Sequence, residues 1–407
     1  MDRNFQFNPK YQELTLSAPP SKSYSHRAII CASFADGISR IKNVVVSRDV
    51  EATINAMKAI GADITLDGDD LVIRGTKKPK IESTLDFKES GSTMRFLIPV
   101  LGQIGFSFTG SKRLLERPLD GYKDICGITL KPNQVDVKHT ITPSRFNIDG
   151  NLSSQFVSGL LFLLPILDGD SIITLDNQVS KPYINMTIDC LEQFGISIEW
   201  DNDIHIKGNQ KYIATEYEVE GDYSLSSFYI GMGLLNGDVS VVGLPLDTYQ
   251  GDKVFIDYIK KMNGNIEIGK TINSKTSMLL GNNFDLTDNP DLLMPLAILA
   301  ANAVGVTKIS GIESLRYKES DRIETTLNTL QEFGVNAYYD KQLIIEGKAI
   351  LSGGDFLSFN DHRIAMMIVA GSLVADKPCV IQGIDCINKS HPGFFDLGIG
   401  EEYEANN

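Results

Sequence analysis

Histidine and cysteine are scarce in this chain, and neither is grouped. The 407 residues include five of each, with no C-x-x-C pair and no cluster with carboxylates at the spacing of a metal site. We therefore expect no metal and no cofactor. The odd number of scattered cysteines, in a chain without a visible export signal, indicates free thiols, mostly in the core of a protein of the reducing cytosol.

Long apolar segments are also missing. The longest, FVSGLLFLLPIL at residues 156–167, contains a glycine and a proline and is about half as long as a membrane span. The N-terminal segment MDRNFQFNPKYQELTL has neither the apolar stretch of a signal peptide nor an Arg/Ser-rich amphipathic pattern. These absences favour a cytoplasmic protein that does not enter a membrane.

Basic residues are outnumbered by acidic ones. The chain has 38 Lys and Arg against 52 Asp and Glu, a net charge of −14. Proteins that bind nucleic acid present basic surfaces, so we expect no nucleic-acid partner. A small anionic ligand is not excluded, because it responds to the charges of its own pocket.

One pattern recurs along the whole chain: a polar, often basic cluster that runs into an apolar helical segment. Successive clusters are 69, 63, 71, 67 and 70 residues apart and begin at Ser21, Ser90, Ser153, Ser224, Asp291 and Asp361. A second series keeps step with the first, as a helix, a glycine and a short alternating strand, and has its glycines at Gly61, Gly127, Gly195, Gly264 and Gly334. Such self-similarity identifies a repeat architecture, in which each glycine is expected to provide the left-handed residue that ends a helix.

The repeats predict the fold class and the domains. One unit of roughly 67 residues cannot bury both of its faces, so three or more must pack together, and six units indicate two domains of three. Breaks at Pro19-Pro20 and at residues 220–222 predict two hinges, which would allow closure over a ligand. The predicted domains are then residues 20–220 and residues 1–19 with 221–407, with the strand QELTLSA (12–18) in the second.

The clusters at the helix starts suit anions. Lys22, Ser23 and Arg27 place an ammonium, a hydroxyl and a guanidinium beside the free N–H groups of a helix start, as a phosphate requires. Each cluster alone is more typical of a helix cap or a turn, but their recurrence favours a shared site. Eight cations occupy such junctions: Lys22, Arg27, Arg95, Arg117, Lys318, Arg322, Arg363 and Lys389. Asp291 and Glu319 stand among them and are candidates for proton transfer, because nearby cations keep carboxylates ionised.

One literal motif points elsewhere. GNIEIGKT at residues 264–271 matches the nucleotide-binding expression G-x-x-x-x-G-K-[ST], which requires a flexible loop that opens a helix. Here its interior occupies the strand position of the repeat, and the following INSKTSMLL lacks a helix start. We expect a strand there and no nucleotide site.

Eight motifs together resemble one enzyme family. SKSYSHRAI, SGSTMR, ERP, SSQF, SKPY, KESDR, NDHR and NKSHP occur in the order and spacing of the 5-enolpyruvylshikimate-3-phosphate synthases, also called 3-phosphoshikimate 1-carboxyvinyltransferases, over essentially the whole chain. The resemblance implies an inside-out α/β barrel fold of two domains, each with three βαβαββ units, buried helices and outer sheets. It also implies a reaction of the shikimate pathway of aromatic amino acid biosynthesis. The enolpyruvyl group of phosphoenolpyruvate passes to the 5-hydroxyl of shikimate 3-phosphate through a tetrahedral intermediate, in a closing interdomain cleft, and phosphate is released.

The resemblance also implies the site residues. Shikimate 3-phosphate would be held by Lys22, Ser23, Arg27, Ser153, Ser154, Gln155, Ser180, Tyr183, Asp291 and Lys318. Phosphoenolpyruvate would be held by Lys22, Gly91, Arg95, Arg117, Gln155, Arg322, Arg363 and Lys389. Asp291, Glu319 and Lys22 would carry the proton transfers, with the division of roles open. Closure needs no partner chain, so a monomer is expected.

Two positions depart from the family pattern. Glu89 stands where many members carry Asn, and Phe96 where many carry Pro. We expect Glu89 to point away from bound phosphoenolpyruvate or to pair with a cation. Gly91 occupies the family's glyphosate-sensitive position, so glyphosate is a candidate inhibitor, but Phe96 leaves the sensitivity open.

Two alternatives compete with this interpretation. The related UDP-N-acetylglucosamine enolpyruvyl transferases share the repeat fold and the chemistry, but they resemble the chain less well at Ser23, Arg27 and residues 153–155. They also usually carry a cysteine in the loop that here reads KRLLERP. A non-catalytic repeat protein that binds phosphorylated metabolites would need the cations but would have no use for Asp291 and Glu319.

Overall fold

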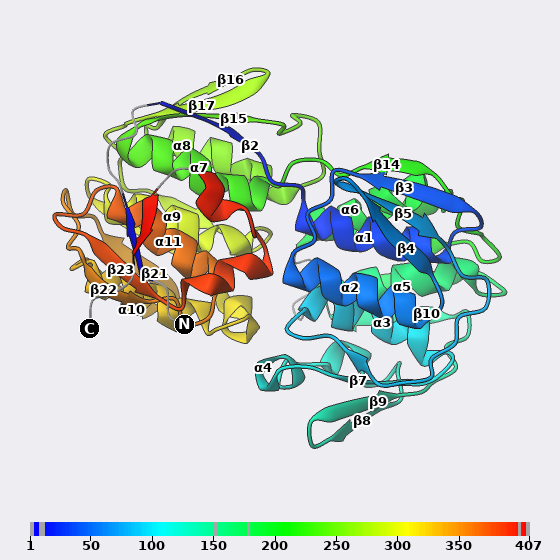
Figure 1. Ribbon diagram of the computed structural model, residues 1–407. Helices are drawn as coiled ribbons and strands as arrows, with labels where there is room; N and C mark the ends of the chain where they lie inside the picture. Colours follow the sequence, from blue (N-terminus) through cyan, green and yellow to red (C-terminus); the bar gives the residue numbers. More distant parts are fainter. Residues whose placement is uncertain (1–3, 8–12, 150–152, 177–179, 398–399, 404–407) are drawn as a thin grey trace. The chain divides into compact units, whose positions relative to one another are not determined.

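The chain folds as two compact units, residues 20–220 and residues 1–19 with 221–407. The structure is a computed structural model that describes residues 4–7, 13–149, 153–176, 180–397 and 400–403 (Figure 1). The two compact units are named the 20–220 unit and the 221–407 unit. Residue 12 of the expected first strand lies outside the described residues, and the rest of that strand forms β2 (Leu14–Ser17).

The 20–220 unit contains three sheets of four strands in its described part. Its helices are α1 (Lys22–Phe34), α2 (Arg48–Ala59), α3 (Gly91–Gly102), α4 (Lys112–Leu115), α5 (Ser154–Leu163) and α6 (Lys181–Gln193). The first sheet, in the order β14-β3-β5-β4, consists of β14 (Glu216–Glu218), β3 (Ile38–Lys42), β5 (Asp70–Arg74) and β4 (Asp63–Asp67). The second consists of β6 (Leu85–Asp86), β7 (Phe106–Thr109), β9 (Gln134–Val137) and β8 (Ile128–Lys131). The third consists of β10 (Arg145–Asp149), β11 (Ser171–Asp176), β13 (Ile204–Ile206) and β12 (Ile198–Trp200).

The 221–407 unit repeats this plan with a shorter last repeat. Its helices are α7 (Tyr223–Asn236), α8 (Phe255–Lys261), α9 (Leu293–Ala301), α10 (Arg322–Glu332) and α11 (His362–Ser372). One sheet consists of β16 (Asn265–Ile268), β17 (Thr271–Lys275), β15 (Asp238–Val242) and β2. The next consists of β18 (Asn283–Asp285), β19 (Val306–Ser310), β21 (Gln342–Glu346) and β20 (Asn336–Asp340). In the last repeat β22 (Gly354–Leu357) pairs with β23 (Cys379–Gln382) in a sheet of two strands among the described residues, and β24 (Gly400–Tyr403) pairs with β1 (Asn4–Phe7).

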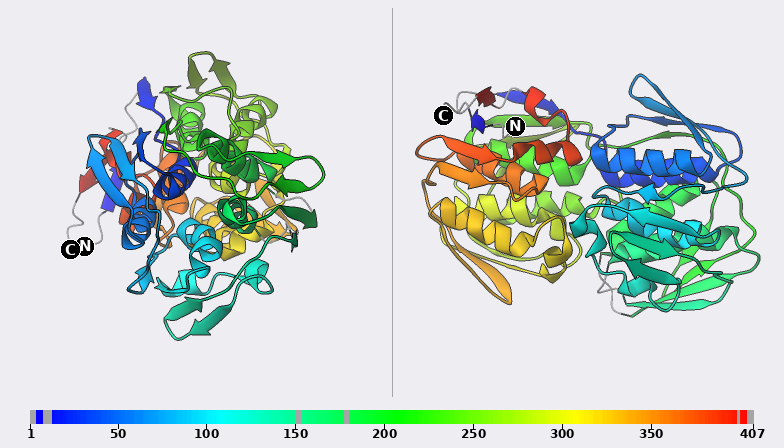
Figure 2. Two further views of the ribbon diagram at one scale, coloured as in Figure 1. Left: turned by 90° about the vertical axis from the view of Figure 1, so that its right-hand side faces the viewer. Right: turned by 60° about the horizontal axis from the view of Figure 1, so that its bottom comes forward.

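Each four-stranded sheet has a parallel pair at one edge, and its other two strands continue the sheet as an antiparallel ladder. The parallel pairs are β14 with β3, β6 with β7, β10 with β11, β2 with β15, and β18 with β19. A parallel pair requires a crossover, which α3 provides between β6 and β7. The repeat helices α3, α5, α9 and α11 are buried on nearly all sides, whereas strands such as β5 alternate between buried and exposed residues. The helices therefore fill each unit and the sheets cover it, as predicted (Figure 2).

The predicted helix starts are confirmed. The six repeat helices begin at Lys22, Gly91, Ser154, Tyr223, Leu293 and His362, within two residues of the predicted cluster starts. The motif at residues 264–271 forms the antiparallel pair of β16 and β17, so the nucleotide-binding interpretation is excluded. All five cysteines are buried and free. Among the described residues, no helix is both long enough and apolar enough to cross a membrane.

The expected left-handed glycines are confirmed at three of five positions. Gly61, Gly195 and Gly334 have positive φ angles of 105°, 80° and 72°. The prediction is wrong at Gly264, because the preceding Asn263 takes the left-handed conformation with φ 63°. It is also wrong at Gly127, where glycine is required for a different reason: a Cβ atom would lie 2.2 Å from the Lys138 carbonyl oxygen.

Candidate active site

Serine caps shape the helix starts of the 20–220 unit. The hydroxyls of Ser21, Ser90 and Ser153 accept hydrogen bonds from backbone N–H groups in the first turns of α1, α3 and α5. Each cap satisfies one of the N–H groups that a helix start leaves unpaired. Ser153 is thus a cap in this structure, and Ser154 is buried as the first residue of α5.

Arg27 is buried and held by uncharged acceptors. Its Nε donates to Thr187 Oγ1 at 2.8 Å, and its Nη1 and Nη2 donate to the carbonyl oxygens of Ser23 at 2.7 Å and Tyr183 at 3.0 Å. The guanidinium carbon lies 5.0 Å from the ring centre of Phe96. Burial lowers the pKa of Arg27, but an arginine stays protonated in proteins. These contacts orient the guanidinium without neutralising it, which prepares it for an anion.

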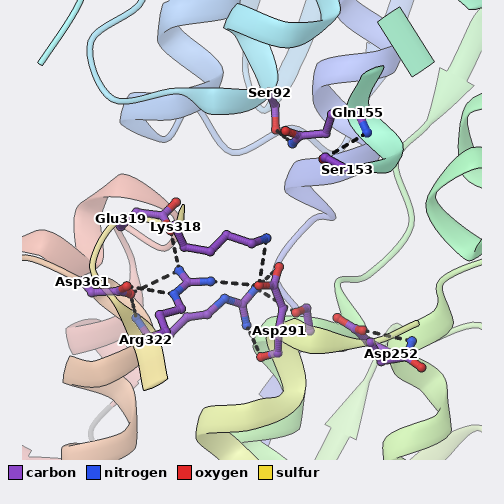
Figure 3. Close-up of polar contacts among 12 residues, drawn as sticks. Ser92, Ser153, Gln155, Asp252, Asp291, Lys318, Glu319, Arg322 and Asp361 are labelled. Carbon is purple, nitrogen blue, oxygen red and sulfur yellow. Dashed lines mark hydrogen bonds and ion pairs between the residues drawn. The ribbon is translucent and has the colours of Figure 1, made fainter. Parts of the chain in front are cut away.

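A second cluster joins α3 and α5. Arg95 Nη1 donates to Gln155 Oε1 at 2.9 Å. Gln155 Nε2 donates to Ser92 Oγ at 3.0 Å (Figure 3). The Tyr122 hydroxyl donates to the Arg95 carbonyl oxygen at 2.7 Å and braces this pair from the core. Tyr122 was missed in the sequence, because its position between two motifs carries no local signal.

Gly91 leaves room for Arg117. A Cβ atom on Gly91 would lie 2.1 Å from Arg117 Nη1, well inside van der Waals contact. Arg117 is buried, with 8% of its surface exposed. The absence of a side chain at the first residue of α3 therefore lets this guanidinium reach the helix start.

Lys22 has a partner that the sequence did not reveal. Its Nζ donates to Asp49 Oδ2 at 2.9 Å, from α1 to the first turn of α2. A buried row of side chains follows between the same helices and α3: His26 Nδ1 is 2.7 Å from Thr53 Oγ1, which is 2.6 Å from Thr93 Oγ1. Burial holds the pKa of His26 well below its usual value, so the imidazole is neutral. These contacts fix the starts of α1, α2 and α3 relative to one another.

Ser180 and Tyr183 open α6. Ser180 is the residue before the helix and has a left-handed backbone with φ 59°. Tyr183 lies in the first turn, and its carbonyl oxygen accepts from both Arg27 and Thr187. The sequence-predicted residues Ser23, Arg27 and Tyr183 are therefore brought together.

In the 221–407 unit, three carboxylates surround one guanidinium. Arg322, 2% exposed, donates from Nε to Asp361 Oδ2 at 2.8 Å and from Nη1 to Asp291 Oδ1 at 2.8 Å (Figure 3). Its Nη2 lies 2.7 Å from Glu319 Oε2. Asp361, which begins the sixth cluster of the sequence and belongs to the NDHR motif, is fully buried. The carboxylates raise the pKa of Arg322 although burial alone would lower it.

Three cations face the Asp291 carboxylate. Lys318 Nζ lies 3.3 Å from Asp291 Oδ1, and Arg363 Nη2 lies 3.7 Å from Oδ2. Burial opposes ionisation of Asp291, but Lys318, Arg363 and Arg322 outweigh it and hold the pKa of this carboxyl well below its usual range. The carboxylate is ionised, and a ligand anion that draws on the same cations would raise its pKa and make it a better base.

Lys389 is the last residue of the 3-10 helix Ile384–Lys389, and two histidines lie in the contacts that follow it. Its Nζ donates to the Asn360 carbonyl oxygen at 2.6 Å. Next to it, Ser390 Oγ is 3.1 Å from His362 Nε2, and the His391 imidazole is hydrogen-bonded to the Tyr229 hydroxyl. Tyr229 and both histidines had no assigned role in the sequence.

Comparisons with known proteins identify the family of this chain. The family model for EPSP synthase (3-phosphoshikimate 1-carboxyvinyltransferase) matches residues 8–397. The chain belongs to the EPSP synthase family. Family membership supports the resemblance found in the sequence. It disfavours the two alternatives, a related sugar-nucleotide transferase and a binding protein without activity.

Relatives of the same family match nearly the whole chain, and a solved structure shares its fold. Proteins named 3-phosphoshikimate 1-carboxyvinyltransferase are 40% identical to it in Clostridium novyi, over 96% of both chains, and 40% identical in Clostridium acetobutylicum, over 96% of this chain and 95% of the relative. A solved EPSP synthase from Acinetobacter baumannii has the same fold, with a TM-score of 0.82 at 24% identity over 99% of this chain and 100% of the other.

The residues that the EPSP synthase motifs indicate gather within each unit. In the 20–220 unit the structure joins Ser23 with Arg27 and Tyr183, Arg95 with Gln155, and Gly91 with Arg117. In the 221–407 unit it joins Asp291 with Lys318, Arg322 and Arg363, and Arg322 with Glu319. No group of His, Cys, Asp and Glu suited to a metal occurs within the part of the chain that the structure describes.

His391 predicts a pH dependence of stability. Burial lowers its pKa from 6.5 to about 4, so the unfolded chain binds a proton that the folded chain does not. The associated stability is complete above pH 6.5 and is lost as the pH falls toward 4. In urea unfolding, His391 should lower the free energy of unfolding by about 2 kcal/mol between pH 7 and pH 5. The variant His391→Phe should lack this part of the pH dependence.

The quantity to compare is the difference in the free energy of unfolding between pH 7 and pH 5 in each protein. The values at a single pH are not compared, because loss of the Tyr229 hydrogen bond lowers the stability of the variant at every pH. The matched control is His205→Phe, since the side chain of His205 is 43% exposed and should leave the difference unchanged. An identical pH dependence in wild type and His391→Phe would contradict a buried neutral imidazole.

Proposed function

We propose that this chain transfers the enolpyruvyl group of phosphoenolpyruvate to the 5-hydroxyl of shikimate 3-phosphate and releases phosphate. The observation that carries the proposal is its 40% identity, over 96% of both chains, to a protein named for this reaction. The site geometry supports it, because cations and carboxylates meet at helix starts in each unit.

We assign shikimate 3-phosphate first to the cluster around Arg27. The buried guanidinium keeps its full charge among uncharged acceptors, and a phosphate would complete its hydrogen bonds. Lys22, Ser153, Ser154, Gln155, Ser180, Asp291 and Lys318 complete the proposed set. Phosphoenolpyruvate is assigned to Lys22, Gly91, Arg95, Arg117, Gln155, Arg322, Arg363 and Lys389.

The proposed chemistry needs one group that accepts a proton and another that donates one. The substrate oxygen forms a bond to C2 of phosphoenolpyruvate as its hydroxyl proton leaves, and C3 gains a proton to give the tetrahedral intermediate. The bond from C2 to the phosphate oxygen then breaks as C3 loses a proton. We assign these transfers to Asp291, Glu319 and Lys22. Asp291 and Glu319 lie beside cations that can stabilise the charged intermediate, and the Lys22 ammonium carries a proton that it can donate.

Neither unit carries the whole proposed set, so we propose that the reaction requires both. Residues 19–20 and 220–222, where the chain passes from one unit to the other, are the proposed hinges. We further propose that the protein acts in the cytoplasm as a monomer, with glyphosate as a candidate inhibitor. Glu89 is proposed to pair with a cation or to point away from phosphoenolpyruvate.

Phosphate release tests the proposed reaction. Purified protein should release phosphate from phosphoenolpyruvate with shikimate 3-phosphate and should not do so with UDP-N-acetylglucosamine. Asp291→Asn and Glu319→Gln should each lower kcat by about 100-fold or more, as loss of general acid–base catalysis does. Glu332→Gln, which changes an exposed carboxylate at the end of α10, is the control and should keep full turnover.

Release only with the sugar nucleotide would reject the proposed function. Near-full turnover in either Asp291→Asn or Glu319→Gln would reject the role of that residue alone.

Gly91→Ala should weaken phosphoenolpyruvate binding. Because the new methyl group would lie 2.1 Å from Arg117 Nη1, the guanidinium must move away from the start of α3. Loss of one charge-assisted hydrogen bond corresponds to about 10-fold or more in KM for phosphoenolpyruvate, with little change in KM for shikimate 3-phosphate. Steady-state kinetics measure both constants.

Gly269→Ala is the control for the glycine substitution itself, because the nearest atom to its Cβ would be 3.9 Å away. A wild-type KM for phosphoenolpyruvate in Gly91→Ala would contradict the proposed role of Arg117.

A further inference from the structure

Asp252 is a buried carboxylate that no motif and no resemblance assigned. It lies in a short 3-10 turn, Gly251–Val254, between β15 and α8, and only 3% of its surface is exposed. Asn289 Nδ2 donates to Asp252 Oδ1 at 3.4 Å (Figure 3), and the hydroxyl of Ser224 is hydrogen-bonded to the same carboxylate. A buried acid needs such partners, and these two lead to the site of the 221–407 unit.

The first path leads through Ser224 to Arg363. Arg363 Nη2 lies 2.8 Å from Ser224 Oγ. A guanidinium can only donate, so the Ser224 oxygen accepts from Arg363 and the single Ser224 proton is left for Asp252. The three groups form a chain in which every donor and acceptor is determined, and it ends on the carboxylate.

The second path leads through Asn289 to Asp291. Asn289 directly precedes the 3-10 turn Pro290–Leu292 that carries Asp291. Arg363 Nη1 in turn donates to the Asp291 carbonyl oxygen at 3.2 Å. The contacts therefore close a ring that runs from Asp252 through Ser224, Arg363 and the Asp291 segment to Asn289 and back.

Charges from three elements face Asp252. They are Asp291 before α9, Asp222 at the start of α7, and Arg363 in α11. Burial and the like charge of Asp291 raise the pKa of Asp252 to about 6, against the opposing effects of Ser224 and Arg363. Asp252 is ionised at neutral pH and becomes protonated in mildly acidic solution, where the chain from Arg363 loses its charged acceptor.

We propose that Asp252 is a positioning residue of this site, which fixes the Arg363 guanidinium beside Asp291 by means of Ser224 and Asn289. It thereby sets the affinity for the anion that Arg363 binds. Only the naming of that anion as phosphoenolpyruvate rests on the proposed function.

Steady-state kinetics of Asp252→Asn, Ser224→Ala and the double variant test the proposal. Each single variant should raise KM for phosphoenolpyruvate by about 10-fold, with kcat within about threefold and KM for shikimate 3-phosphate unchanged, since a charge-assisted contact is lost at one anion only. The double variant should resemble the single variants, because both changes break the same chain. Below about pH 6 the wild type should lose kcat/KM for phosphoenolpyruvate more steeply than Asp252→Asn, which has no carboxylate left to protonate.

The matched control is Asp257→Asn, which removes an exposed carboxylate five residues further along and should leave all constants unchanged. An unchanged KM for phosphoenolpyruvate in Asp252→Asn would overturn the proposal. Independent, multiplicative effects of the two substitutions in the double variant would also overturn it. Equal rises in both KM values would do the same, because they indicate general damage to the fold.

Calorimetric titration with inorganic phosphate separates this proposal from the proposed function, because it needs no turnover. Asp252→Asn should bind phosphate about 10-fold more weakly than wild type and Asp257→Asn. If the wild type released no phosphate from phosphoenolpyruvate, the proposed function would fail, and the titration would still decide the role of Asp252. Equal phosphate affinity in all three proteins would overturn that role.

Discussion

The candidate site residues of the 221–407 unit depend on one interaction, the ion pairs between the buried Arg322 guanidinium and its carboxylate partners. Arg322 is the first residue of α10, its partner Asp361 caps α11, and its partner Asp291 stands just before α9. One side chain thus ties three helix starts together. Removal of one partner from such a buried pair leaves an uncompensated charge and costs about 3–5 kcal/mol, so the position of Asp291 cannot drift without a large loss of stability.

The two units use the same repeated helix start for different chemistry. In the 20–220 unit the acceptors around Arg27 and Arg95 are hydroxyl, amide and carbonyl oxygens, which orient the cations and leave their charge for a ligand. In the 221–407 unit the acceptors around Arg322 are carboxylates, which can also exchange protons. Lys22 departs from this division, because it is paired with Asp49. The repeat therefore provides a common scaffold, and the acceptors beside its cations differ between the two units.

Local chemistry explains what the sequence could predict. Ser21, Ser90 and Ser153 act on backbone groups two or three residues away, so their caps, and the starts of the repeat helices, are legible in the chain. Asp49, Tyr122 and Asp252 were missed because their partners are distant in sequence, such as Asn289, 37 residues from Asp252. Gly264 shows the same limit between neighbouring residues, because the repeat pattern does not indicate that Asn263 takes the left-handed position.

The central claim is that Arg27 and Arg363 contact the substrate anions while Arg322 stays paired with Asp361. A crystal structure with shikimate 3-phosphate and inorganic phosphate bound tests it most directly. We predict anionic ligand oxygens within hydrogen-bonding distance of the Arg27 and Arg363 guanidinium groups, with Arg322 still paired with Asp361. Ligands that contact neither guanidinium, or an Arg322 released from Asp361, would contradict the account.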